Sequence, residues 1–495
     1  MKNIYSRFLE NVQSNPGKTS ICGEGSSISY KDLYKSAERL SEILLENDVK
    51  QGAKLGVVLE NGYEFATLLL AASKNDLTLV PQSTDLPADK ATQIFNLLEI
   101  DCLISSPTYL RNIKHKHKEI KKIAINSGDI FNWIDEFTHH IEVKAQCKNH
   151  PFIVTLTSGS TGSPKPIALT QNIKIKRILS AKELYQLSME DIILVGTPMY
   201  HSLAQRLTLL PLFLGGTCVI LKKFSLNLWL GYVERFSVSF TIAVASQLKQ
   251  LVHSNLDNYN LSSLRVLVSS SELLPYQDKL KLIDNLECDF NECYGASEIG
   301  IATNLSMQNT QTKKGSIGKP ISGVDIKIID PIANINLNTG EIGEICVKSI
   351  MEFDSYYQNK ELTEKAYISE YFKTGDLGKF DKDGYLYFHG RNKEIIITGG
   401  INIYPKDIED EILKIRGVRE CSVIGVPDTS LGEVPVAVIS VEDSLFNLRD
   451  VKLSCINNLA SSQIPRKFIQ VDRLAKNEVG KIQKKLVFEQ VQSLL

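Results

Sequence analysis

The first third of the chain alternates between helical and strand-like hydrophobic patterns. In the segment 31–47, apolar residues recur at helical spacing and predict an amphipathic helix with one buried face: Leu33, Ala37, Leu40 and Leu44. A second helical segment, 63–74, lies between two short apolar runs that predict buried strands, 54–60 and 77–81. The pattern recurs at 191–201 and 236–246. This βαβ alternation predicts parallel sheets covered by helices.

The pattern changes after about residue 314. Short strands separated by glycine turns replace the long helices and predict a barrel-like or antiparallel β-section: 315–330, 340–349 and 384–391. After Arg391 the pattern returns to mixed α+β, with predicted strands at 394–405, 420–428 and 434–440 and a helix at 406–415. The fold class is therefore α/β. We expect a large N-terminal domain, 1–391, with two helix-covered sheet subdomains and the β-section, and a small α+β C-terminal domain, 392–495.

The composition is that of a globular protein with sizeable cores, since 43% of the 495 residues are hydrophobic. Lys and Arg number 56 against 57 Asp and Glu, so no strong net charge favours nucleic acid or an anionic membrane as partner. The beginning of the chain lacks a continuous apolar run, and the apolar segment 207–223 is interrupted by Pro211, so we expect neither a signal peptide nor membrane insertion. Nine cysteines without CxxC spacing favour a reducing, cytoplasmic location.

One hydrophilic stretch, "LTSGSTGSPKPIALT" from Leu156 to Thr170, has nothing to bury. A glycine- and hydroxyl-rich loop between a strand and a helix suits phosphate binding, because backbone N–H groups converge on the anion and Ser and Thr add donors. Lys165 follows Pro164 rather than glycine, so the loop is not a Walker A motif. The loop by itself fits a flexible surface linker equally well.

Further motifs follow in order along nearly the whole chain. "PMYH" ends at His201, "VSSSELLP" runs from Val268 to Pro275, and "YGASE" ends at Glu298. They are followed by "GSIGKP", "YFKTGD" ending at Asp376, "GRNKEIIITGGINIYPKDIE", "IGVPDTSLGE", and "NEVGKIQKK" around Lys481. Together with the 157–165 loop, this series resembles the adenylate-forming superfamily: acyl-CoA synthetases, peptide-synthetase adenylation domains and beetle luciferases. It is most similar to a free-standing acid–CoA ligase.

The resemblance implies a two-step reaction. The carboxylate of a small-molecule acid attacks the α-phosphorus of ATP, which gives an acyl-adenylate and pyrophosphate, and a thiol then displaces AMP. The implied cofactors are ATP, Mg²⁺ and CoA, or phosphopantetheine on a carrier protein. Because one anion must approach a polyanion, the site has to supply positive charge and aligned donors.

The resemblance also assigns roles to individual residues. Lys481, His201 and Glu298 would be catalytic, and Glu298 and Thr161 would bind the metal. ATP or AMP would contact the remaining motif residues: Thr157, Ser158, Gly159, Ser160, Thr161, Gly162, Lys165, Ser271, Glu272, Tyr294, Gly295, Ser297, Asp376 and Arg391. Asp376 would accept the ribose hydroxyls. Lys481 would contact both the acid and the α-phosphate.

The acyl group and the thiol have their own expected residues. The acyl pocket would be formed by mostly apolar or small side chains: Ser202, Leu203, Arg206, Val244, Gln247, Ser270, Ile299 and Gly300. The C-terminal domain would rotate about a hinge at Lys393 and bring Gly399 and Gly400 to a thiol tunnel. Ser270 and Ser271 replace the usual glycine pair. Arg206 could pair with a second carboxylate or form a structural salt bridge.

Three other functions stay open from the sequence. A free-standing enzyme that loads an acyl or amino acid onto a carrier-protein phosphopantetheine arm would present the same motifs. A catalytically silent homologue that only binds a nucleotide is disfavoured by intact Lys481, Glu298 and Asp376. Luciferase-like oxygenation has little support. The sequence does not identify the acid, the acceptor, the pathway or the oligomeric state.

Overall fold

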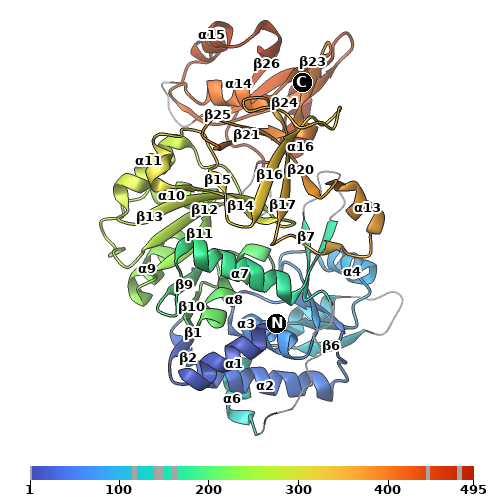
Figure 1. Ribbon diagram of the computed structural model, residues 1–495, viewed down its shortest axis with the longest axis vertical. Helices are drawn as coiled ribbons and strands as arrows, with labels where there is room; N and C mark the ends of the chain where they lie inside the picture. Colours follow the sequence, from blue (N-terminus) through green and yellow to red (C-terminus); the bar gives the residue numbers. More distant parts are fainter. Residues whose placement is uncertain are drawn as a thin grey trace. The chain divides into compact units, whose positions relative to one another are not determined.

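The computed structural model describes residues 3–113, 120–138, 140, 150–157, 165–441, 446–476 and 482–495, with the side chain of Thr157 excepted. The chain forms two compact units. The first, called here the N-terminal unit, holds residues 1–314, 320–325 and 348–367, and the second, the C-terminal unit, holds 315–319, 326–347 and 368–495. Their elements are labelled in Figure 1. The predicted domain boundary at 391/392 lies within the second unit and stays a prediction.

The N-terminal unit contains two sheets of predominantly parallel strands. The first runs β14-β13-β12-β11-β9-β10-β1-β2, with bounds Gly300–Ser306, Asp289–Ala296, Val266–Ser270, Phe240–Val244, Ile192–Val195, Thr217–Ile220, Thr19–Gly23 and Ser26–Ser29. The second runs β18-β8-β7-β4-β3-β5-β6, with bounds Ser355–Tyr356, Lys165–Leu169, Ile153–Thr157, Thr78–Pro81, Lys54–Val58, Cys102–Ser105 and Lys121–Ala124. β3, β4 and β5 pair in parallel, as do β9, β11 and β12, so the predicted parallel sheets are confirmed.

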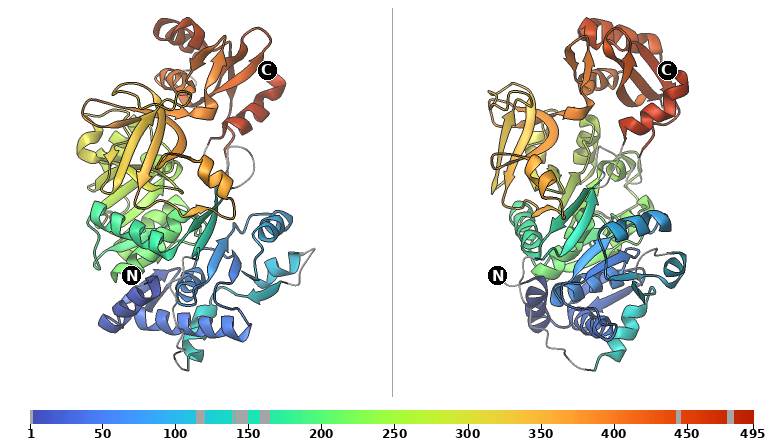
Figure 2. Two further views of the ribbon diagram at one scale, coloured as in Figure 1. Left: turned by 45° about the vertical axis from the view of Figure 1, so that its right-hand side comes forward. Right: turned by 90° about the vertical axis from the view of Figure 1, so that its right-hand side faces the viewer.

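Helices cover these sheets. They are α1 (Ile4–Ser14), α2 (Tyr30–Glu46), α3 (Tyr63–Lys74), α4 (Ala88–Leu97), α5 (Pro107–Asn112), α6 (Asp129–Glu136), α7 (Gln171–Tyr185), α8 (Ser202–Leu214), α9 (Leu226–Phe236), α10 (Ala245–Val252), α11 (Tyr276–Asn285), α12 (Met307–Thr310) and α13 (Lys360–Lys365). The four apolar residues predicted on one face of α2 are all buried in the main core. Figure 2 shows α1 and α2, both in blue, side by side. No helix in the described part of the chain has the length and apolar character needed to cross a bilayer.

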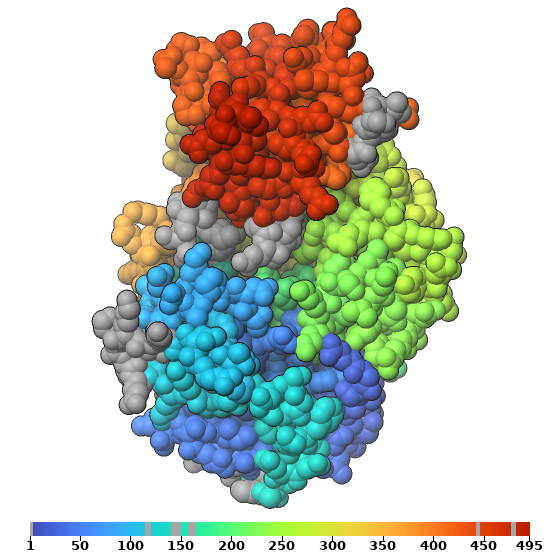
Figure 3. Space-filling view, turned by 180° about the vertical axis from the view of Figure 1, so that it is seen from behind, coloured from blue at the N-terminus to red at the C-terminus, as the bar shows by residue number. Residues whose placement is uncertain are grey.

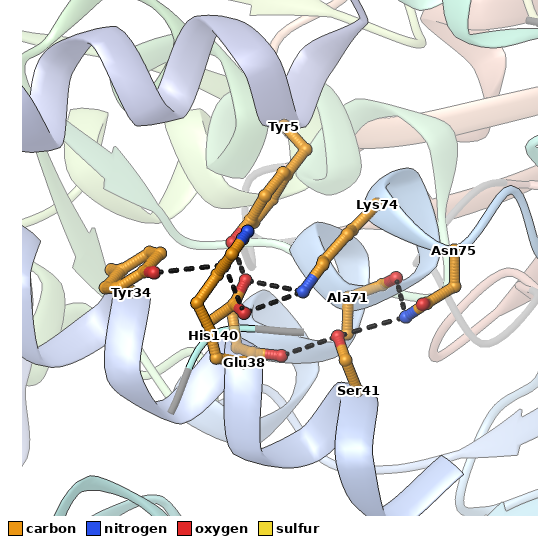
Figure 4. A network of polar contacts seen from close by, with 9 residues as sticks. Tyr5, Tyr34, Glu38, Ser41, Ala71, Lys74, Asn75 and His140 are labelled. Atoms are coloured by element: carbon orange, nitrogen blue, oxygen red, sulfur yellow. Dashed lines mark hydrogen bonds and ion pairs between the residues drawn. The ribbon is translucent and has the colours of Figure 1, made fainter. Parts of the chain in front are cut away.

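A buried polar network joins the first three helices (Figure 4). Glu38 on α2 is 0% exposed, and both of its carboxylate oxygens accept from Lys74 Nζ on α3 at 2.7 Å. Tyr5 on α1 donates its hydroxyl to Glu38. His140 Nδ1 lies 2.8 Å from Glu38 Oε2 and 3.2 Å from the Tyr34 hydroxyl. Because a buried charge is tolerated only when paired and hydrogen-bonded, this network fixes how the three helices pack.

Distant segments also meet at the surface of this unit. α6 packs beside α2, and Arg39 Nε on α2 lies 3.2 Å from Glu136 Oε2 on α6, although 97 positions separate the two residues. Figure 3 shows the blue N-terminal segment and the turquoise segment that includes α6 next to each other.

The C-terminal unit contains two further sheets. One is the predicted antiparallel β-section, built on β16 (Val324–Ile329), β17 (Gly343–Ser349), β20 (Tyr371–Phe380) and β21 (Leu386–Arg391). The other has the order β23-β22-β25-β24, with β26 paired to β25, and its bounds are Ile401–Ile403, Ile396–Thr398, Gly432–Val441, Val418–Asp428 and Lys467–Val471. Its helices are α14 (Pro405–Ile412), α15 (Leu448–Asn458) and α16 (Lys484–Val491). The strands and the helix predicted after Arg391 are confirmed.

Candidate active site

The glycine- and hydroxyl-rich loop connects two antiparallel strands. β7 ends at Thr157, β8 begins at Lys165, and these two residues pair in register. The sequence pattern predicts this loop between a strand and a helix, but a second strand, β8, comes before the helix. The apolar residues after Lys165 pack as a strand, and α7 starts only after Thr170, whose side chain accepts from the Ile173 N–H. The predicted phosphate contacts of the loop lie outside the described residues: the Thr157 side chain, Ser158, Gly159, Ser160, Thr161 and Gly162.

A lysine, a tyrosine and a glutamate meet beside this hairpin. The two-residue strand β18 pairs with β8, with Tyr356 opposite Ile167. This pairing puts Lys165 Nζ 5.1 Å from the centroid of the Tyr356 ring. The Tyr356 hydroxyl donates to Glu298 Oε1 at 3.1 Å. Burial raises the pKa of Glu298, whereas the Tyr356 hydrogen bond and the charges of Lys165 and Arg177 act to lower it.

The turn that carries Glu298 is fixed by its backbone. Tyr294, Gly295 and the residues up to Gly300 form the end of the β13–β14 hairpin. A Cβ atom on Gly295 would lie 2.0 Å from the Gly300 carbonyl oxygen, so the close approach of the two strands requires glycine there. Arg177 Nη2 donates to the carbonyls of Ser297 at 2.8 Å and Glu298 at 3.3 Å.

The ends of two parallel strands carry the predicted acyl-pocket residues. Val244 ends β11 and Ser270 ends β12, and the two pair in register, so the structure brings them together. Gln247 accepts from the Val244 N–H at 3.3 Å and donates to the Gly196 carbonyl at 2.9 Å, so its amide holds two neighbouring strand ends in place. Ser271 has φ +75°, a conformation that glycine adopts without strain.

Other predicted residues lie around the same strand ends. Glu272 follows Ser271 and is half-buried, and Ile299 is completely buried. Gly300 has φ +75°. Their expected contacts with nucleotide or acyl group remain predictions.

His201 lies at the N-terminus of α8, followed on that helix by Ser202, Leu203 and Arg206. Burial lowers the pKa of His201 to about 4, so the imidazole is neutral at pH 7. Asn61 fixes the preceding loop, because its Oδ1 accepts from the Met199 N–H at 2.7 Å and its Nδ2 donates to the Thr197 carbonyl at 2.9 Å.

The C-terminal unit brings two predicted ribose-binding residues together. Asp376 on β20 pairs in register with Arg391 on β21, and Arg391 Nε lies 2.9 Å from Asp376 Oδ1. The predicted hinge residue Lys393 is exposed in the short 3₁₀ helix Asn392–Glu394 that follows. Lys481 lies outside the described residues.

The two glycines of the expected thiol tunnel form the β22–β23 turn. Thr398 pairs with Ile401, and Gly399 and Gly400 between them have φ +56° and +83°. A two-residue hairpin of this kind needs positive φ at both central positions, which explains the glycine pair locally.

Sequence reasoning missed three residues of this region: Tyr356, Arg177 and Asn61. Tyr356 is 58 positions from Glu298 and lies in a strand too short to show any periodicity. Arg177 had a detectable signal, because it recurs at helical spacing with Ala181 and Tyr185 on the buried side of α7.

Comparison with known proteins agrees with this architecture. The sequence profile of the AMP-binding enzyme family matches residues 8–357, and that of the AMP-binding enzyme C-terminal domain matches residues 407–481. The chain is 26% identical to indoleacetate–CoA ligase of Aromatoleum aromaticum, over 95% of this chain and 94% of the relative. It is 25% identical to long-chain-fatty-acid–CoA ligase FadD13 of Mycobacterium tuberculosis, over 99% of both.

A solved structure has the same fold. O-succinylbenzoate coenzyme A synthetase (MenE) of Bacillus subtilis, in complex with ATP and magnesium ion, superimposes with a TM-score of 0.86 at 24% identity, over 98% of this chain and 99% of that one. The fold and the family match together define an AMP-forming acid–thiol ligase. The chain belongs to the AMP-binding enzyme family.

Proposed function

We propose that this chain joins a small carboxylic acid to CoA with the residue roles expected from the sequence. The observation that carries the proposal is the grouping of Lys165, the residue that follows the 158–164 segment in the sequence, with Tyr356 and Glu298. This grouping sets a cation and a carboxylate side by side, as ATP-dependent adenylation requires. The CoA-ligase relatives favour CoA over a carrier protein as the acceptor.

Glu298 fits a role in binding Mg²⁺. Magnesium takes hard oxygen ligands, usually one or two carboxylates together with substrate phosphates and water, and Glu298 offers such an oxygen. Among the described residues, no group of three or more His, Cys, Asp and Glu side chains could hold a metal ion. When bound, Mg²⁺ would neutralise charge on the phosphates of ATP.

Lys165 and His201 would act on the two reactants differently. The Lys165 ammonium would attract phosphate oxygens, and its position over the Tyr356 ring restricts where that charge can lie. His201 is neutral at pH 7 and would lie beside the acid without forming an ion pair with it, so the substrate carboxylate would keep its nucleophilicity. Asp376 and Arg391 keep their expected role at the ribose as a prediction.

The Lys393 hinge has local support. The 3₁₀ helix Asn392–Glu394 is followed by one backbone hydrogen bond, from the Ile395 N–H to the Asn392 carbonyl, at 3.4 Å. A bond of this length is weak, so this backbone bond is a small obstacle to a change of φ and ψ, and the hinge itself rests on the family resemblance.

The test is pyrophosphate release from ATP and Mg²⁺ across fatty, aryl, dicarboxylic and amino acids, with and without CoA. We expect release that depends on the acid, hydroxamate when hydroxylamine is added, and a thioester only when CoA is present. ATP hydrolysis that is indifferent to every acid would contradict the proposal.

A further inference from the structure

Two helices of the N-terminal unit bring together two buried cations and one half-buried cation. Lys174 and Arg177 on α7 are 2% and 4% exposed, and Arg206 lies on α8, which packs against α7 (Figure 1). The charges of Arg177 and Arg206 both act on Lys174, so the three side chains form one cluster. None of the three forms an ion pair with a carboxylate among the residues that the structure describes.

The three cations differ in their hydrogen-bond partners. Arg177 has a structural role, because it donates to the carbonyls of Met351, Ser297 and Glu298. Lys174 Nζ, in contrast, donates to two neutral side chains, to Gln205 Oε1 at 2.8 Å and to the Ser202 hydroxyl at 3.5 Å. Arg206 Nε is inaccessible to water and has no hydrogen-bond partner among the described residues.

Arg206 lies near the carboxyl ends of the parallel strands. Its charge acts on Cys293 of β13, and the Cys293 thiol forms a side-chain hydrogen bond with Ser270, the last residue of β12. Ligands of open parallel sheets bind beyond the carboxyl ends of the strands. The same stretch holds Val244 and Ser270, both expected at the acyl group.

Burying such cations without anions is unfavourable. Removing an ammonium from water is unfavourable unless an opposite charge lies nearby, and a second cation beside it adds repulsion. The direction of the Lys174 pKa agrees, since burial and then the charges of Arg177 and Arg206 lower it well below the usual value. Arg177 lies within range of the charges of Glu298 and Asp354, whereas the charges that act on Lys174 are those of the two arginines. An anionic ligand would supply the missing charge for Lys174 and Arg206.

We propose that the acid activated by this chain is a dicarboxylic acid, whose second carboxylate is bound by Arg206 and Lys174 while the first reacts with ATP. The inference rests on the proposed function and narrows its substrate class. Arginine suits this role, because its planar guanidinium donates two parallel hydrogen bonds to a carboxylate. With this anion beside it, Lys174 would stay protonated.

The test compares acids that differ only in the second carboxylate. Malonate, succinate, glutarate, adipate and isophthalate are paired with propionate, butyrate, valerate, hexanoate and 3-methylbenzoate, in which a methyl group replaces the second carboxylate, and kcat/KM is measured by pyrophosphate release. We expect the best diacid to exceed its paired monoacid at least tenfold. Arg206→Met should lower kcat/KM for that diacid at least 100-fold and remove its advantage over the paired monoacid. Arg206→Lys should recover part of the loss.

A control and a stability measurement separate a binding role from a structural one. Arg235→Met, on α9, should leave the diacid preference unchanged, since Arg235 lies over the ring of Phe236 and is not part of the cation cluster. Lys174→Met should lose the preference and raise the melting temperature of the ligand-free protein, because it removes an uncompensated buried cation. A Lys174→Met protein that melts lower and still prefers the diacid would overturn the inference.

The two proposals fail in different ways. Wild-type preference for the monoacid in every pair would overturn the dicarboxylate inference and leave the CoA-ligase proposal standing. Absence of acid-dependent pyrophosphate release in the whole panel would count against the proposed function. Calorimetric titration of the five diacids without ATP would then decide the anion site: binding lost in Arg206→Met supports it, and no binding overturns it.

Discussion

Tyr356→Phe is the most direct test of the candidate site, because it removes a single oxygen atom and keeps the ring near Lys165. The hydroxyl donates to Glu298 Oε1 at 3.1 Å. A hydrogen bond to a charged group contributes about 1.5–3 kcal/mol, and this one is longer than the usual O–H···O distance, so we take about 1.5 kcal/mol. That free energy corresponds to about a tenfold change in an equilibrium constant or rate.

The direction of the expected change in activity follows from the pKa of Glu298. The hydroxyl favours the ionised carboxylate and so acts to lower the pKa of Glu298, which burial raises. Its removal raises this pKa further. If adenylation requires ionised Glu298, the variant should lose activity at a higher pH than the wild type as the pH falls. The loss should be about tenfold on the acidic limb and smaller at alkaline pH, where both enzymes are ionised.

The assay is pyrophosphate release at saturating ATP as a function of pH and Mg²⁺ concentration. Tyr357→Phe is the matched control, since Tyr357 is the next residue and no described contact joins its hydroxyl to Glu298. Rising Mg²⁺ should restore part of the Tyr356→Phe activity, because the metal competes with the proton for the same carboxylate. An unchanged acidic limb in Tyr356→Phe, or an equal shift in Tyr357→Phe, would refute this reasoning.

Three further predictions concern stability and the two half-reactions. Glu38→Gln should lower the free energy of unfolding, measured in urea, by about 3–5 kcal/mol, because Lys74 stays buried without its partner. The double variant Glu38→Gln/Lys74→Met should recover part of this loss. A loss under about 1 kcal/mol in Glu38→Gln would contradict the prediction. Lys481→Ala should abolish adenylation but spare thiolysis of preformed adenylate, whereas Lys393→Pro should do the reverse; equal loss of both steps in either variant would argue against domain rotation. The pKa of His201 is about 4 in the folded protein against 6.5 for the free side chain, so up to about 3 kcal/mol of the free energy of unfolding is lost as the pH falls from 6.5 to 4. In urea denaturation at a series of pH values, His201→Gln should flatten the dependence of stability on pH in this range. An unchanged slope would contradict the burial argument.

The parts of the fold that the sequence predicted are those with a strong local period. The buried face of α2 and the parallel strands β3 and β4 follow directly from the spacing of apolar residues. The Gly399–Gly400 turn was visible as a glycine pair, although its left-handed conformation gives a local reason for glycine beyond the expected thiol tunnel.

The parts that the sequence missed depend on contacts between distant residues. β8 has only five residues, and its polar start reads as the continuation of a loop. Tyr356 reaches Glu298 only because β18 pairs with β8. Lys174 resembles a solvent-facing position of α7, and its burial follows from the packing of α7 on α8. Pattern reasoning treats a cation as a surface signal, and here that assumption fails.

Burial moves each of three titratable side chains in this unit toward its neutral form. It lowers the pKa of His201 and Lys174 and raises that of Glu298. Charged ligands reverse these effects, since a metal or phosphate favours ionised Glu298 or protonated lysine. In the empty site, burial disfavours the charged forms of these side chains. A phosphate or carboxylate of the substrate supplies an opposite charge for lysine, and a metal ion supplies one for Glu298. The instability of the empty site is then part of the free energy by which it selects them.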